Sequence, residues 1–139
     1  MQVLVDTSVL SLFFRRRSQH LNPNEERITK ELRDLVDEGR CELVGVVRQE
    51  LLSGIRSREQ FEQVRHRLRA FPNEPLTVED YEEAAVAHNQ CRSAGISGSP
   101  VDFLLCAISL RRGWPIFTTD ADFTSYADVL SLKLHSPRN

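Results

Sequence analysis

Apolar residues follow two different spacings along this chain, and together these spacings predict strands that alternate with helices. The run from Met1 to Val5 is short and mostly apolar, which is typical of a buried strand. Between residues 24 and 38 the apolar side chains instead recur at i, i+4, i+7 and i+8, which is the spacing of one helix face. The same contrast recurs along the rest of the chain.

The pattern predicts five strands, over residues 1–5, 42–47, 76–78, 115–118 and 130–135. It predicts helices over residues 9–14, 24–38, 57–71, 77–95 and 99–113, with a further short helix around Glu50. Asn24 is the expected cap of the second helix. Thr77 with Asp80, and Ser99 with Asp102, form capping patterns at two later helix starts. Residues 119–123 read as a turn.

Strands that alternate with helices indicate a mostly parallel sheet with helices on both faces. No internal repeat, low-complexity tract or linker interrupts the pattern. At 139 residues the chain is long enough to bury one sizeable core. We therefore expect a single α/β domain over residues 1–139.

Composition narrows the class of protein without giving a function. The net charge of -2 provides no overall basic excess, although all but two of the 18 basic residues are arginines, which suit phosphate groups. Cys41, Cys91 and Cys106 form no CxxC pair, which favours reduced thiols in the cytoplasm. Asp6 interrupts the first apolar run and the basic cluster follows it, so we expect no signal peptide. No apolar stretch approaches the ~20 residues of a membrane span.

Five carboxylates lie where predicted strands end or the following helices begin. They are Asp6 after the first strand, Glu50 past the second, Asp102 in a helix first turn, and Asp120 and Asp122 after the fourth strand. Ligands of parallel sheets bind beyond the carboxyl ends of the strands. If the first and fourth strands are neighbours, these acids face one crevice. We then expect Asp6 to point outward rather than to be buried.

Carboxylates that converge repel one another, so such a crevice either takes up protons or binds a cation. Three or four acids without a histidine ligand suit Mg²⁺ or Mn²⁺ better than zinc. No lysine or second basic run is placed in the sequence to neutralise them. One or two such ions can activate water for attack on a phosphodiester.

Four stretches of the sequence together resemble the PIN domain. They are Asp6-Thr7-Ser8, residues 50–54 (ELLSG), Asp102 with the FLLCAISL that follows it, and residues 118–123 (TTDADF). The length of the chain and the order of these four stretches match the VapC-type toxins of prokaryotic toxin–antitoxin pairs, and the resemblance covers essentially the whole chain. The resemblance implies a three-layer fold with a five-stranded, mostly parallel sheet of order 3-2-1-4-5. That order would place the first and fourth strands side by side.

The resemblance also implies roles for individual residues. The acids similar to the catalytic ones are Asp6, Glu50, Asp102 and Asp120. The expected ligands of Mg²⁺ or Mn²⁺ are Asp6, Asp102, Asp120 and Asp122. Thr7 or Ser8 resembles the hydroxyl that orders the first acid or a bound water. Cys106 stands where the family usually has alanine, a difference that concerns packing.

A metal-dependent endoribonuclease that acts as a toxin is the leading interpretation. The resemblance implies a tRNA or ribosomal RNA substrate and a small cognate antitoxin that covers the acidic crevice. It also implies a toxin homodimer that forms a heterotetramer or larger assembly with the antitoxin, in the cytoplasm and not at a membrane. Arg15, Arg16 and Arg17 are candidate RNA contacts. Residues 9–14, with Leu32 and Leu35, are either a partner surface or core.

Plainer interpretations remain for each residue. Asp6 and Asp102 also fit the role of helix caps. Glu50 fits a solvated position on a helix, and Asp120 and Asp122 fit a turn. The arginines, including those over residues 56–69, also fit solvated faces. The alternative function is a catalytically silent PIN-like module that binds RNA or protein, whose marker would be a missing acid. The Thr7-Ser8 pair after Asp6 fits neither a receiver domain nor a haloacid-dehalogenase-like phosphatase, and no GxGxxG supports dinucleotide binding.

Overall fold

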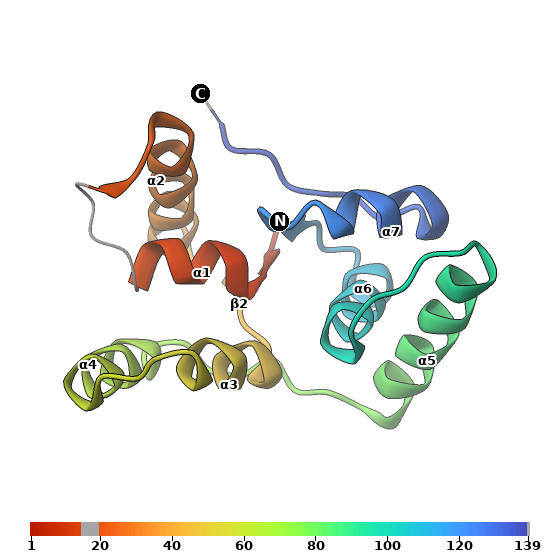
Figure 1. Cartoon of the computed structure of the whole chain (residues 1–139), viewed down its shortest axis with the longest axis horizontal. Helices are drawn as coiled ribbons and strands as arrows, with labels where there is room; N and C mark the ends of the chain where they lie inside the picture. Colours follow the sequence, from red (N-terminus) through yellow and green to blue (C-terminus); the bar gives the residue numbers. More distant parts are fainter. Residues whose placement is uncertain (15–19, 139) are drawn as a thin grey trace.

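The computed structural model describes residues 1–14 and 20–138, so Arg15, Arg16 and Arg17 lie outside the described residues. The elements are β1 (Val3–Val5), α1 (Thr7–Phe14), α2 (Pro23–Asp37), β2 (Cys41–Glu42), α3 (Gly45–Ser53), α4 (Arg58–Leu68), α5 (Val78–Ser93), α6 (Pro100–Arg112), β3 (Ile116–Phe117) and α7 (Asp122–Leu130). In Figure 1, α1 to α4 lie on one side of the short central strands and α5 to α7 lie on the other.

β1 is the middle strand of a parallel sheet with the order β2-β1-β3. Val3 and Leu4 pair with β2, and Leu4 and Val5 pair with β3. All three side chains of β1 are fully buried, as expected for a parallel strand between two layers of helices. The expectation that the first strand neighbours the strand near residue 116 is confirmed. The loops that follow β1 and β3 therefore meet at one edge of the sheet.

Only three strands form in residues 1–14 and 20–138, instead of the five expected. Single parallel bridges, from Leu43 to Asn73 and from Ile116 to Leu134, replace the two outer strands. Helices take up part of both predicted segments, because Thr77 caps α5, which begins at Val78, and α7 continues to Leu130 with Ser131 as its left-handed C-cap. The predicted strands over residues 76–78 and 130–135 are therefore wrong, while the parallel α/β arrangement is confirmed.

The run over residues 42–47 is extended as far as Val44 and helical from Gly45, which corrects the predicted second strand. β2 ends at Glu42, Val44 is still extended with φ -100° and ψ 143°, and α3 then begins at Gly45. α3 buries Val47 and Leu51 one turn apart and includes the short helix expected around Glu50. The short run over residues 43–47 (LVGVV) carries no period that separates a strand from a buried helix, which explains the error.

Two helices begin at residues that the sequence analysis did not select. α7 occupies the predicted turn, and its buried residues Phe123, Tyr126 and Leu130 follow the helical spacing i, i+3, i+7. α2 is capped by Asn22 rather than Asn24, because Asn22 forms a reciprocal capping box and is followed by a proline. The helical spacing of these three apolar residues is present in the sequence, but the turn-forming residues at the start of α7 indicated a turn instead.

The predicted caps of α5 and α6 are confirmed. The N–H of Asp80 donates to the Thr77 hydroxyl at 3.3 Å, and the N–H of Thr77 donates back to the Asp80 carboxylate at 2.9 Å. At α6 the N–H of Asp102 donates to Ser99 Oγ at 3.1 Å. These caps satisfy backbone donors that the first helical turn leaves without a partner.

Asp80 also ties the start of α5 to the end of α6. Its buried carboxylate accepts hydrogen bonds from Arg111 Nε and from Arg112 Nη2, each at 2.8 Å. The bonds from Arg112 are the main reason why the pKa of Asp80 lies well below its usual range. Asp80 is therefore a structural acid that is neutralised by two cations.

We expect Asp80→Asn to lower the free energy of unfolding at pH 7 by about 3 kcal/mol, because two guanidinium groups lose their buried anion. Because the pKa of Asp80 is depressed in the folded state, its contribution is complete above the ordinary pKa of about 3.9. It is lost as the pH falls through the folded-state value. The deficit of the variant should therefore shrink between pH 7 and pH 3.

Urea unfolding of wild type, Asp80→Asn and Glu79→Gln at both pH values measures this effect. Glu79 is an exposed acid in the same helical turn, so it controls for the change in charge. A loss in Asp80→Asn no greater than the loss in Glu79→Gln would contradict the account.

Candidate metal centre

Asp6 lies at the end of β1 with only 5% of its surface exposed. Its Oδ2 accepts hydrogen bonds from the hydroxyls of Ser8 and Thr118, each at 2.8 Å. These bonds offset part of the cost of burying the carboxylate. The expectation that Asp6 points outward and is not buried is wrong. Its N–H still donates to the Phe117 carbonyl at 3.0 Å, so Asp6 remains within the ladder between β1 and β3.

Ser8 and Thr118 join the loops that follow β1 and β3. Thr118 Oγ1 accepts from the N–H of Asp120 at 3.0 Å, and Ser8 Oγ accepts from the N–H of Thr119 at 2.9 Å. The two hydroxyl oxygens are 3.2 Å apart. Ser8 thus orders the carboxylate of Asp6 from the first turn of α1, and Thr118 orders it from the loop after β3. Thr118 was not among the predicted site residues. Its position directly after a strand that pairs with β1 is the feature of the sequence that could have indicated its role.

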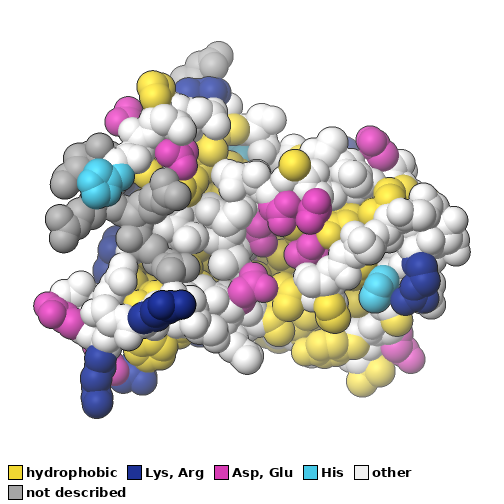
Figure 2. All heavy atoms as spheres, viewed as in Figure 1, with side chains coloured by type: hydrophobic (Ala, Val, Ile, Leu, Met, Phe, Trp, Pro, Cys, Tyr) yellow, Lys and Arg dark blue, Asp and Glu magenta, His cyan; other side chains and the backbone are white. Residues whose placement is uncertain are grey.

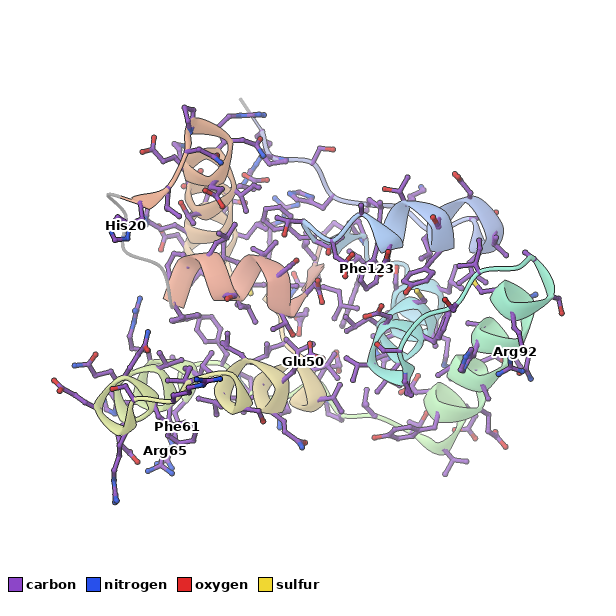
Figure 3. The ribbon with its side chains drawn as sticks, in the orientation of Figure 1. His20, Glu50, Phe61, Arg65, Arg92 and Phe123 are labelled. Atoms are coloured by element: carbon purple, nitrogen blue, oxygen red, sulfur yellow. The ribbon has the colours of Figure 1, made fainter. Side chains whose placement is uncertain are left out.

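Thr7 contacts a different acid. Its hydroxyl donates to Glu50 Oε1 at 2.5 Å, which joins the first turn of α1 to α3. The side chain of Glu50 is exposed, and Figure 3 shows it on α3 below α1. Glu50 therefore lies at the margin of the acidic region.

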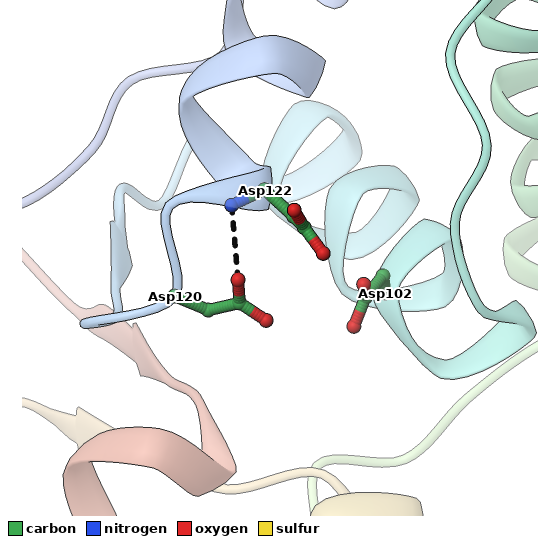
Figure 4. A group of neighbouring side chains, drawn as sticks. All are labelled: Asp102, Asp120 and Asp122. Atoms are coloured by element: carbon green, nitrogen blue, oxygen red, sulfur yellow. Dashed lines mark hydrogen bonds between the residues drawn. The ribbon is translucent and has the colours of Figure 1, made fainter.

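Three of the predicted acids converge at the surface, and we call them the acid trio: Asp102, Asp120 and Asp122. One carboxylate oxygen from each lies within 4.8 Å of those of the other two (Figure 4). They come from the first turn of α6, from the loop after β3 and from the first residue of α7. The N–H of Asp122 donates to Asp120 Oδ1 at 2.9 Å. Figure 2 shows acidic side chains gathered at the centre of this face, next to apolar surface.

Asp102 combines a capping position with a place in the trio. Its backbone N–H is held by Ser99, while its half-buried carboxylate accepts a hydrogen bond from the hydroxyl of Tyr126 at 2.7 Å. Burial raises the pKa of Asp102, and the bonds from Tyr126 and Ser99 oppose that rise. The negative charges of Asp6 and Asp120 raise the pKa further. The net shift of the pKa is upward, chiefly because the carboxyl group is half-buried, and the neighbouring negative charges add to it.

The donor chemistry of the trio fits a divalent cation. None of the five predicted acids forms an ion pair with a basic side chain of residues 1–14 or 20–138. The converging ligand atoms are all carboxylate oxygens, which suit Mg²⁺ or Mn²⁺. A cation held by the trio would compensate the burial of the Asp102 carboxylate and its repulsion by neighbouring acids. Asp6 is near enough to act on Asp102 electrostatically.

Tyr126 is the second residue of this region that the sequence analysis missed. It lies on α7 four residues after Asp122, and residues at this spacing share a helix face. The signal was therefore present in the sequence. It becomes readable only when residues 122–130 are recognised as a helix, because the predicted turn ended at residue 123 and no element was predicted over residues 124–129.

The chain belongs to the PIN domain family, whose profile matches residues 3–129. Its fold is similar to the crystal structure of FitAcB from Neisseria gonorrhoeae (TM-score 0.73, 18% identity, 98% of each chain). It is also similar to VapBC2 from Rickettsia felis bound to a promoter DNA fragment (TM-score 0.73, 13% identity, 97% of this chain and 98% of that chain). A toxin–antitoxin complex from Klebsiella pneumoniae gives a TM-score of 0.65 at 16% identity, over 88% of this chain and 90% of that chain.

A search of curated proteins gives no significant match. At identities below one fifth, the likeness to the solved structures establishes a shared fold. Within the described parts of the chain, no helix is long and apolar enough to cross a bilayer.

Neutralising one acid of the trio should have opposite effects on the metal-free and metal-loaded protein. In Asp120→Asn, the amide can still accept from the N–H of Asp122. The repulsion within the trio falls, so the free energy of unfolding without metal should rise by about 0.5 kcal/mol. The increase in melting temperature that Mn²⁺ gives the wild type should shrink, because binding to the folded state weakens.

Scanning calorimetry in EDTA and in Mn²⁺ measures both effects. Asp128→Asn changes an exposed acid of α7 outside the trio and is the control. A metal-free Asp120→Asn protein that is less stable than wild type, with an undiminished response to Mn²⁺, is the result that would refute the electrostatic account.

Proposed function

We propose that the protein is a Mg²⁺- or Mn²⁺-dependent endoribonuclease and the toxin of a VapBC-type toxin–antitoxin pair. One observation carries the proposal: Asp102, Asp120 and Asp122 converge within 4.8 Å at the edge where β1 and β3 end. Membership of a family whose members are generally nucleases supports it, as does the likeness in fold to proteins solved as toxin–antitoxin complexes. Free Cys41, Cys91 and Cys106 suit a cytoplasmic place of action.

A divalent cation bound here would lower the pKa of a coordinated water and place positive charge beside the phosphodiester. The chain itself supplies the ligands Asp102, Asp120 and Asp122. Asp6, held through Oδ2 by Ser8 and Thr118, keeps Oδ1 for a water or for the cation. This fixed geometry avoids reorganisation when the substrate binds.

Glu50 has a separate role in this proposal. Thr7 binds only one of its carboxylate oxygens, at 2.5 Å, and the side chain is exposed at the margin of the acidic region. The other oxygen is available to accept a hydrogen bond from water or from a ribose hydroxyl. The catalytic acids of the proposal are thus Asp6, Glu50, Asp102 and Asp120, and RNA is the substrate.

Cleavage of a tRNA mixture tests this function. We expect Mg²⁺-dependent cleavage that EDTA abolishes and that Asp120→Asn lowers by about 100-fold, because a ligand charge is lost. Asp128→Asn should cleave like wild type. Full activity in EDTA or in Asp120→Asn would exclude the metal mechanism. A wild-type protein that binds RNA but leaves it intact would favour the silent binding module.

The expected partner surface near the start of the chain is largely core. Val9, Leu10, Phe14, Leu32 and Leu35 are each at most 9% exposed. They therefore pack inside the protein and cannot form an antitoxin or dimer surface. The part of this region that remains accessible is the rim formed by the end of α1 and its neighbours.

We propose that this rim receives an apolar segment of the antitoxin. Phe13, Val36 and Phe71 are only partly buried there, around an apolar hollow of about 10 Å³ that is too small to hold a side chain of a partner. The guanidinium groups of Arg33 and Arg67 lie 5.7 and 5.6 Å from the centre of the Phe13 ring. An acidic, amphipathic antitoxin segment lying across the rim would contact both these partly exposed apolar side chains and the two cations.

Phe13→Ala should weaken antitoxin binding about tenfold, because it removes a partly exposed aromatic side chain from the rim. Calorimetric titration with the product of the short reading frame beside the toxin gene measures the affinity. Leu110→Ala, which alters an exposed apolar residue of α6, is the control. Equal affinities for both variants would place the antitoxin elsewhere.

A further inference from the structure

Tyr126 connects the acid trio to the core of the protein. Its ring is fully buried, 5.0 Å from the ring of Phe103 and 5.1 Å from that of Phe123 between centroids. Its hydroxyl donates a hydrogen bond to Oδ2 of Asp102 at 2.7 Å. α7 therefore contributes Asp122 to the trio and, one turn later, a rigidly held donor to a second member of the trio.

The loop before α6 leaves space for this hydroxyl at Gly98. A Cβ atom on residue 98 would lie 2.3 Å from the hydroxyl oxygen of Tyr126 and 2.9 Å from Cζ. Both distances are well below van der Waals contact, so a methyl group on residue 98 would force the hydroxyl of Tyr126 away from its present place. The backbone of Gly98 is not in the left-handed region, so the requirement for glycine is one of space.

We propose that Tyr126 is a positioning residue of the metal centre, whose hydroxyl fixes the orientation in which the Asp102 carboxylate faces Asp120 and Asp122. The terminal torsion of an aspartate is soft, so a carboxylate among like charges rotates away from them unless something holds it. The hydroxyl holds Oδ2 without cancelling the negative charge. This inference rests on the proposed function, since it assumes that the trio binds a divalent cation.

The hydroxyl and the ring of Tyr126 have separable effects. Tyr126→Phe keeps the buried ring and its contacts with Phe103 and Phe123 and removes only the donor to Asp102. If Tyr126 served packing alone, metal affinity would not change. Removal of a group that forms a hydrogen bond with a metal ligand typically weakens metal binding about 10–100-fold.

Direct Mn²⁺ titration of the full chain without RNA, followed by the electron paramagnetic resonance signal of free Mn²⁺, tests the proposal. We expect Tyr126→Phe to raise the Kd for Mn²⁺ about tenfold. Tyr81→Phe is a matched control, because Tyr81 is the only other tyrosine of the chain and is 55% exposed on α5. A Kd of Tyr126→Phe within twofold of wild type would overturn the proposal.

Gly98→Ala provides a second test that keeps the tyrosine. Its methyl group displaces the hydroxyl of Tyr126, so Mn²⁺ affinity should fall as in Tyr126→Phe. Wild-type affinity in Gly98→Ala would overturn the positioning role even if Tyr126→Phe failed to fold. A wild-type protein that binds no Mn²⁺ would overturn the proposed function as well. Binding by wild type and Tyr126→Phe with equal affinity would overturn the positioning role alone.

Discussion

Repulsion among the carboxylates beyond the ends of β1 and β3 is the constraint on which this region depends. Burial raises the pKa of Asp102 most, the negative charges of Asp6 and Asp120 raise it further, and no basic side chain of the described residues forms an ion pair with these acids. The sheet brings the acids together because β1 and β3 are parallel neighbours whose carboxyl ends share one edge. The fully buried strand β1 gives this edge a rigid base.

Buried acids elsewhere in the protein have very different partners. Asp80 is held by Arg111 and Arg112, and Glu31 is held by His135 and Arg138. These partners are cationic or become cationic on protonation, so the carboxylates stabilise the fold by charge pairing. Asp6 and Asp102 instead receive hydrogen bonds from neutral hydroxyls. Hydroxyl donors fix a carboxylate in place and leave its charge intact, as a cation site requires.

The sequence was sufficient to locate the acids but not to describe their surroundings. Asp102, Asp120 and Asp122 could be placed together because residues at strand ends and helix starts are positioned by the parallel sheet itself. The burial of Asp6 could not be foreseen, since it depends on Thr118, which is 112 residues away in sequence. Local periodicity also misread α3, where an apolar run fits both states, and α7, where turn-forming residues precede a helical stripe. Because α7 was not predicted, the position of Tyr126 beside the acid trio was not recognised either.

The central claim is that the acid trio binds a divalent cation. Anomalous diffraction from crystals of the wild-type protein grown with Mn²⁺ tests it most directly, because the anomalous peak locates the ion without reference to activity. The account predicts a peak within bonding distance of carboxylate oxygens of Asp102, Asp120 and Asp122. A well-ordered trio with no peak, or a peak only at another place on the protein, would contradict it.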